Sequence, residues 1–270
     1  MTKKILYEVY APKNITEMTA REFENALTTA DIAVLSFGAI ENHANHLPLG
    51  TDNFQGEAMM KRTAAMLTED GLPAIPAFCV PFGVQTNLFE RDYVMGNVFL
   101  SQDTFIRMVS ELVLSLADNG FKRFVFCVSH AEDFAALNVI AKDLGDKHHI
   151  PIIVVDWITA KWKIVSAQGR GMNNQGHAGE GETSNILAIA PNLVDLSADV
   201  EAYYEPEDQH VVLDDGLFYY GGSVGIYTPV KEDHSPGYGG EPAKATAENG
   251  DYYLDVCARW MADVVLKYWG

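Results

Sequence analysis

The sequence is poor in basic residues. Its 270 residues include 19 lysines and arginines against 37 aspartates and glutamates, which gives a formal net charge of −18 at pH 7. A surface of this charge repels the phosphates of nucleic acids and anionic membranes, and the few basic residues are scattered along the chain. We therefore expect no nucleic acid and no membrane as a partner.

Cysteines, long apolar runs and nucleotide-binding motifs are also scarce or absent. Cys79, Cys127 and Cys257 lie far apart and form no CxxC motif. No run approaches the ~18 apolar residues of a membrane span, and the N-terminal residues lack the apolar core of a signal peptide. No GxGxxG or P-loop motif follows a strand-like run. An odd number of dispersed cysteines suits a reducing compartment, so we expect a cytoplasmic protein.

Apolar strand-like runs alternate with helical patterns along the chain. The strands are apolar on both faces, which is typical of a parallel sheet covered by helices. We predict strands at 32–38, 74–80, 123–129 and 151–157, and helices at 19–27, 54–68, 104–120, 132–146, 182–190 and 243–269, the last interrupted near Asn249-Gly250. The sequence therefore predicts one α/β domain over residues 1–270, a three-layer sandwich with a mostly parallel central sheet.

Histidines and carboxylates follow two of the predicted strands. Glu41-x-His43 follows the first strand and His130-x-Glu132 the third, and side chains two apart in an extended segment point the same way. Asp52 stands near the start of the next helix. Ligands bind at the carboxyl ends of parallel strands, and imidazole and carboxylate groups suit zinc, manganese or iron. This pattern is compatible with a metal site, in which a carboxylate could bridge two ions.

Each of these residues alone has a simpler explanation. A histidine at a strand end is most often structural, and an aspartate before a helix is usually an N-cap. The repeated acid/His spacing argues for the metal site, but spacing alone leaves both interpretations open. We expect His46, beside the first motif, to have a structural role.

A third group of polar residues lies in GHAGEGETS, residues 176–184. Its three glycines allow the backbone to approach a ligand closely. His177, Glu180 and Glu182 are candidates for moving protons to a leaving group, although a glutamate at a helix start also stabilises the helix dipole.

The stretch GAIENHANHLPLGTD, residues 38–52, resembles the signature of the creatininase (creatinine amidohydrolase) family. SHAED, GHAGEGETSNILAIAPNLVDL and YGGEPAKATAENG resemble further blocks of the family, in the same order and across most of the chain. The resemblance implies a creatininase-like α/β sandwich with two divalent ions, zinc and manganese or in some members iron. It also implies homohexamers built as trimers of dimers.

The resemblance also assigns roles to individual residues. It implies two ligand sets that share a bridging Asp52: Glu41, Asp52 and His130 for one ion, and His43, Asp52 and Glu132 for the other. His177 and Glu182 match the catalytic histidine and glutamate of the family, and His46 matches a residue that is not a ligand.

The chain departs from creatininase itself around the expected substrate. Ala131 replaces an aromatic residue, and Asn173, Asn174 and Gln175 stand where creatininase has a tryptophan-rich stretch before its catalytic histidine. We expect these four residues to contact the substrate. Amides in place of aromatic rings indicate a polar compound that bears hydroxyl or amide groups, rather than creatinine.

The sequence thus predicts a binuclear metal-dependent hydrolase that attacks a carbonyl or amide carbon of a small polar, cyclic compound, with C–N bonds of cyclic amides as the main expectation. Two alternatives within the family are a hydrolase opening a cyclic keto-inositol (3-dehydro-scyllo-inosose type) in inositol catabolism and a formamide hydrolase of the riboflavin/deazaflavin pathway type. A non-enzymatic protein that kept the fold is disfavoured, because competent residues fill all the predicted ligand positions.

Overall fold

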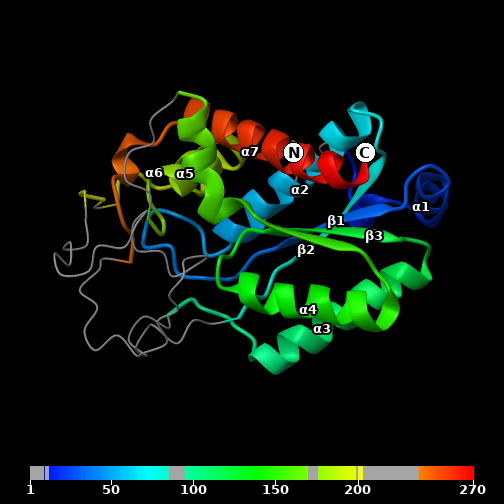
Figure 1. The fold of residues 1–270 in the computed structure, drawn as a ribbon. Coiled ribbons are helices and arrows are strands. Elements are labelled where there is room, and N and C mark those ends of the chain that lie inside the picture. The colour runs from blue at the N-terminus through cyan, green and yellow to red at the C-terminus, as the bar shows by residue number, and fades with distance from the viewer. Residues whose placement is uncertain (1–8, 10–11, 85–94, 170–175, 199, 203–236) are drawn as a thin grey trace, which may run out of the picture.

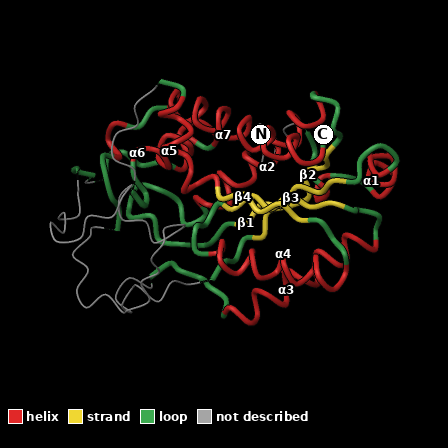
Figure 2. Tube along the Cα trace, viewed as in Figure 1, coloured by secondary structure: helices red, strands yellow, loops and turns green. Residues whose placement is uncertain are grey.

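A four-stranded parallel sheet forms the centre of the structure (Figures 1 and 2). The structure is a computed structural model and describes residues 9, 12–84, 95–169, 176–198, 200–202 and 237–270. The strands are β1 (Ile32–Phe37), β2 (Ala74–Val80), β3 (Arg123–Val128) and β4 (Ile152–Asp156), in the spatial order β2-β1-β3-β4. All four were predicted within two residues of these bounds, and the parallel pairing is confirmed.

The central strand β1 is buried along its whole length. It pairs in parallel with β2 on one side, where Ile32 lies opposite Ala74, and with β3 on the other, where Ile32 lies opposite Arg123. Pro76 lies in β2, which is an edge strand, and proline is tolerated there because one side of the strand needs no ladder hydrogen bond. This burial on both faces explains why the strand sequences are uniformly apolar.

Helices cover both faces of the sheet, which gives the predicted three layers (Figure 1). One face packs against α3 and α4, and the other against α2, α5 and α7, with α6 beyond α2 and α7. The helices are α1 (Ala20–Leu27), α2 (Thr51–Glu69), α3 (Gln102–Asp118), α4 (Asp133–His148), α5 (Trp157–Ala167), α6 (Glu180–Ile189) and α7 (Ala247–Trp269). None of the described helices is both long and apolar enough to span a bilayer.

Two helices differ from the sequence-based prediction. The helix α5 was missed, since its isoleucines, threonine and valine disfavour a helix. Asp156 nevertheless caps it, and the buried residues Trp157, Lys161, Ile164 and Val165 follow a helical spacing. The predicted interruption of the last helix is wrong: α7 begins after the N-cap Thr246 and runs without a break.

A glycine in α7 allows that helix to contact α6 through the backbone. A Cβ atom at Gly250 would lie 1.9 Å from the carbonyl oxygen of Ser184 and 2.7 Å from the amide nitrogen of Asn185. The glycine is therefore required by the close approach of two helices and does not end α7.

This contact predicts a large effect of a single methyl group. We expect Gly250→Ala to lower the free energy of unfolding by about 2–3 kcal/mol, because the methyl group meets rigid backbone. The matched control is Gly145→Ala in α4, where the Cβ atom would lie 3.7 Å from its nearest neighbour. It should stabilise the protein slightly, by up to about 1 kcal/mol. Urea denaturation of both variants measures the difference, and equal stabilities would contradict this packing.

A second glycine brings α2 against the end of β1. A Cβ atom at Gly38 would lie 2.5 Å from Asn53 Oδ1 and 2.9 Å from the carbonyl carbon of Asp52. The first turn of α2 can therefore approach the point where β1 ends, which places Asp52 beside the residues that follow the strand.

Candidate metal centre

The ends of β1 and β3 are joined by hydrogen bonds. The carbonyl oxygen of Phe37 accepts from the backbone N–H groups of Ser129 (2.8 Å) and His130 (3.2 Å). The segment that follows β1 folds back on itself, since the Glu41 N–H donates to the Leu49 carbonyl at 2.9 Å. The two predicted motifs therefore meet at the carboxyl edge of the sheet.

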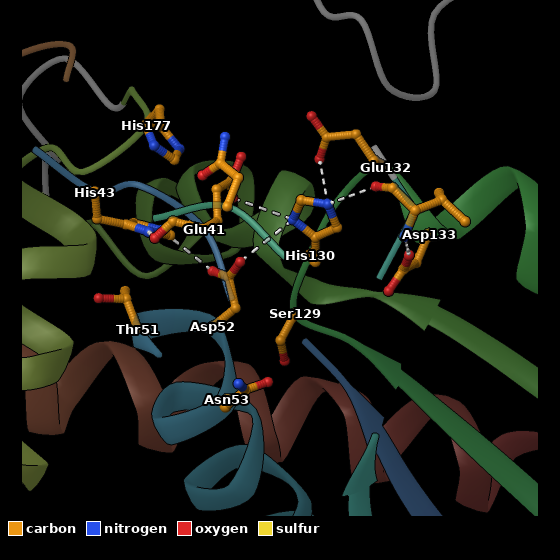
Figure 3. Close-up of polar contacts among 12 residues, drawn as sticks. Glu41, His43, Thr51, Asp52, Asn53, Ser129, His130, Glu132, Asp133 and His177 are labelled. Carbon is orange, nitrogen blue, oxygen red and sulfur yellow. Dashed lines mark hydrogen bonds and ion pairs between the residues drawn. The ribbon is translucent and has the colours of Figure 1, made fainter. Parts of the chain in front are cut away.

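Asp52 lies between the two motifs (Figure 3). It is 2% exposed, and its Oδ1 lies 3.4 Å from His43 Nε2 while its Oδ2 lies 3.3 Å from His130 Nδ1. The N-cap of α2 is Gly50, so Asp52 is not the cap that was considered as an alternative. Its carboxylate instead lies between two imidazoles.

The structure brings together the first predicted ligand set. Donor atoms of Glu41, Asp52 and His130 lie within 4.8 Å of one another, a spacing at which one ion could contact all three. Glu41 Oε2 lies 3.3 Å from His130 Nδ1, on the same side of the ring as Asp52. This group is candidate site 1.

The second predicted set is arranged differently. His43 and Asp52 form a group with Glu182, whose Oε2 lies 3.6 Å from His43 Nε2. Glu132 lies on the far side of His130 (Figure 3), with its Oε2 3.4 Å from His130 Nε2. The group of His43, Asp52 and Glu182 is candidate site 2, and in this structure Glu182 stands where Glu132 was expected.

Both histidines present one ring nitrogen to these groups and use the other to hold the ring. His43 Nδ1 donates to the Glu41 carbonyl at 3.1 Å, and His130 Nε2 donates to the Val84 carbonyl at 3.1 Å. Metal-binding histidines characteristically donate the second ring N–H in this way. The fixed rings leave His43 Nε2 and His130 Nδ1 facing Asp52.

Two buried atoms of the group lack ordinary partners. His43 Nε2 and Asp52 Oδ2 form no hydrogen bond to any other described residue. Buried polar atoms in proteins are almost always hydrogen-bonded. Each of the two atoms faces an oppositely charged group at 3.3–3.4 Å without a hydrogen bond. Together with the nitrogen and oxygen donors, which suit zinc, manganese and iron, this arrangement fits bound divalent cations.

The pKa values of His43, His130 and Asp52 are all shifted from their ordinary values. Burial alone would lower the pKa of His43, but the neighbouring carboxylates of Asp52 and Glu182 outweigh it and raise the pKa to about 10. Burial is likewise outweighed at His130, whose pKa lies well above its usual value, mainly through Glu132 and Glu41. The pKa of Asp52 is lowered, because the charge of His43 outweighs the effect of burial. Protons on the imidazoles thus balance the carboxylates when no metal is bound.

His177 lies beside candidate site 2. It is exposed, its ring centroid lies 4.3 Å from that of His43, and its Nε2 donates to the Asn42 carbonyl at 2.6 Å. Glu41, His43 and His177 form a third group of donor atoms within 4.8 Å of one another. His177 is therefore the candidate residue that reaches from this group to solvent.

Several further residues help to shape the centre. His46 Nε2 donates to the Ala178 carbonyl at 2.9 Å, in agreement with the structural role expected for it. Asp133, which the sequence did not single out, is fully buried beside His130 and accepts from the Val84 N–H at 2.8 Å. Burial raises the pKa of Asp133 to about 7. Its place directly after the His130 motif is the only sequence signal for it.

The predicted substrate contacts lie only partly within the described residues. Ala131 follows His130 at the carboxyl edge and is partly exposed. Asn173, Asn174 and Gln175 lie outside the described residues, so their predicted contact with substrate stays a prediction.

The family is decided by the sequence comparison. The family model named Creatininase, described as creatinine amidohydrolase, matches residues 16–265. The chain belongs to the creatininase family. A curated relative, the creatinine amidohydrolase of Pseudomonas putida, is 24% identical over an alignment of 266 residues, which covers 93% of this chain and 95% of the relative. The chain is thus a creatininase-family hydrolase whose candidate metal ligands lie together at one edge of the sheet.

Solved structures of creatininases share the fold. A structure of creatinine amidohydrolase (creatininase) superposes with a TM-score of 0.69 at 22% identity, covering 94% of this chain and 96% of that one. A structure named Creatininase Mn gives a TM-score of 0.67 at 22% identity, covering 94% of this chain and 98% of that one. A variant creatininase of Zn-Zn type gives 0.66, with the same identity and coverage.

The placement of Glu182 and Glu132 predicts a rank order of metal affinities. We expect Glu182→Gln to weaken zinc binding at candidate site 2 more than Glu132→Gln does, by at least the ~10-fold typical of a disturbed metal ligand shell. Competition with a chromophoric chelator measures both affinities. The opposite order would assign the third ligand to Glu132, as the family resemblance implies.

The raised pKa values of the histidines predict that metal binding releases protons. A metal ligates the neutral imidazole, whereas the pKa of His43, raised to about 10, keeps this ring protonated at pH 7.5 without metal. Affinity for zinc should therefore increase as the pH rises toward 10. Calorimetric titration at pH 7.5 in two buffers of different ionisation enthalpy should give different heats, and equal heats would contradict the assignment.

Proposed function

We propose that the protein is a binuclear metal-dependent hydrolase that attacks a carbonyl or amide carbon of a small polar, cyclic compound. The observation that supports it most is the sharing of Asp52 by two candidate sites, each completed by one histidine and one glutamate. Membership of the creatininase family supports the reaction class. We propose zinc or manganese as the ions, with iron as a further candidate.

The residues divide into those that hold the ions and those that move protons. Glu41, Asp52 and His130 would hold one ion, and His43 with Asp52 the other, completed by Glu182 or Glu132. When bound, two such ions supply an activated water nucleophile and polarise the carbonyl oxygen of the substrate. His177 is exposed beside His43, so it is placed to pass a proton to the leaving group.

Glu182 has a second candidate role in proton transfer. It is 8% exposed, and its Oε2 accepts from the Ala178 N–H at 2.7 Å, so the carboxylate is held firmly. A fixed carboxylate beside the nucleophile can accept a proton as a general base. Ligation and proton transfer are alternatives for this residue, and the metal affinity of Glu182→Gln separates them.

The substrate class is inferred from the residues near the centre. Ala131 carries no aromatic ring that could stack on a flat substrate, and the amides at 173–175 would bind hydroxyl or amide groups. We propose C–N bonds of cyclic amides as the target, with a cyclic keto-inositol and a formamide as the two alternatives; the relatives named creatinine amidohydrolase keep creatinine in the panel. Hydrolysis assays of the metal-loaded protein with creatinine, formamides, lactams and keto-inositols distinguish these substrates.

We further propose that the chain is a single domain and that it lies in the cytoplasm, in keeping with its few dispersed cysteines. The family resemblance implies that it assembles into homohexamers. Its acidic composition, with a net charge of −18, supports the absence of nucleic-acid and membrane partners. The proposed reaction requires a small-molecule substrate.

The proposed function predicts the effect of one ligand substitution. Glu41→Gln removes a charged ligand of candidate site 1, so we expect turnover to fall to background while the urea unfolding midpoint changes little. The matched control is Glu111→Gln, an exposed position in α3 on the other side of the sheet, which should keep full activity. Full activity of a stably folded Glu41→Gln protein would exclude the proposed role of Glu41.

A further inference from the structure

A buried amide links the two carboxylates of candidate site 2. Gln55 is fully buried, and its Nε2 donates to Asp52 Oδ1 at 3.1 Å and to Glu182 Oε1 at 3.1 Å. Carboxylates only accept hydrogen bonds, so the amide nitrogen must face them and the side chain cannot be flipped. Both N–H groups of Gln55 are therefore used to hold two acidic side chains from different helices.

A second amide fixes the first. Asn185 is also fully buried, and its Nδ2 donates to Gln55 Oε1 at 3.0 Å. The other amide atom of Asn185, Oδ1, has no hydrogen-bond partner among the described residues. A buried acceptor without a partner is unfavourable. The buried position of Asn185 is therefore explained by its hydrogen bond to Gln55, because its own Oδ1 atom gains no partner there.

The four residues form two equivalent pairs. Asp52 and Gln55 are three residues apart on α2, and Glu182 and Asn185 are three residues apart on α6, so each pair lies on one helix face. Each helix thus supplies one carboxylate and one amide, and the amides connect the pairs across the interface.

The charges explain why amides occupy these positions. Asp52 and Glu182 are acidic groups that both lie near His43 Nε2, and they repel each other unless something holds them. Gln55 offers two N–H donors without a net charge, so it restrains the carboxylates and leaves their negative charge for a cation. It bonds Asp52 through Oδ1, whereas Asp52 Oδ2 accepts no hydrogen bond from the described residues and faces His130 Nδ1 at 3.3 Å.

We propose that Gln55, oriented by Asn185, is a positioning residue that sets the spacing of Asp52 and Glu182 and thereby the metal affinity of candidate site 2. This inference rests on the proposed metal centre, and it adds two neutral residues that are neither ligands nor acid–base groups. Residues that orient metal ligands typically change affinity by about 10–100-fold when they are replaced.

The test measures zinc affinity of the full chain by chelator competition, after metal removal. Gln55→Met keeps the length of the side chain and removes its hydrogen bonds, and it should weaken binding by about 10–100-fold. Asn185→Leu should weaken it less, because Gln55 keeps its two carboxylate bonds. The double variant should equal Gln55→Met, since Asn185 acts only through Gln55.

The matched control is Thr63→Val. Thr63 is fully buried on the same helix, but its hydroxyl faces Met261 Sδ at 4.0 Å instead of the metal centre. It should leave zinc affinity unchanged even if stability falls. Urea denaturation of each metal-free variant reports stability separately, and affinities are compared under conditions in which every variant is folded.

The outcomes distinguish this inference from the function on which it rests. If the unsubstituted protein binds no zinc, the proposed metal centre is wrong. If it binds zinc and Gln55→Met binds equally tightly, the positioning role of Gln55 is wrong and the centre stands. Independent, additive losses from Gln55→Met and Asn185→Leu would also overturn it, because they would show that Asn185 does not act through Gln55.

Discussion

The shared carboxylate of Asp52 is the interaction on which the centre depends. It lies buried between His43 and His130, within 3.4 Å of a ring nitrogen of each. A buried carboxylate is stable only when positive charge or hydrogen-bond donors surround it. Protonated imidazoles can supply that charge in the metal-free protein, and divalent ions can replace those protons. The same geometry therefore explains the perturbed pKa values and the fit to metal ions.

The fold brings these groups together through close backbone contacts. Parallel pairing aligns the ends of β1 and β3, and Gly38 lets the first turn of α2 reach them. On the other side, Gly250 lets α7 pack directly on α6, which carries Glu182. The buried Glu180 strengthens this contact, since it accepts hydrogen bonds from Ser184 of α6 and from Asn249 and Tyr253 of α7. The packing of α7 on α6 thus helps to fix the position of Glu182 in candidate site 2.

The sequence predicts the strands and the residue types of the metal centre. It predicts less well which of these residues lie closest to one another. Apolar strands and the repeated acid/His pairs stand out because each is a local pattern. Local patterns do not reveal which helix faces meet, so Gly250 was interpreted as a break. For the same reason the sequence could not place Glu182 nearer than Glu132 to His43. The helix α5 was missed because its β-branched residues disfavour a helix. Gln55 and Asn185 gave no signal, because neutral amides are ordinary helix residues until their partners are known.

The most direct test of the central claim is the metal content of the protein and of an Asp52→Asn variant. Both are stripped with a chelator, equilibrated with zinc, freed of excess metal and measured by elemental analysis. If Asp52 joins two sites, the unsubstituted chain should retain two ions and the folded variant should lose both, since the substitution affects each site. The account would be contradicted if the unsubstituted chain retained no zinc, or if the variant retained as many ions as the unsubstituted chain.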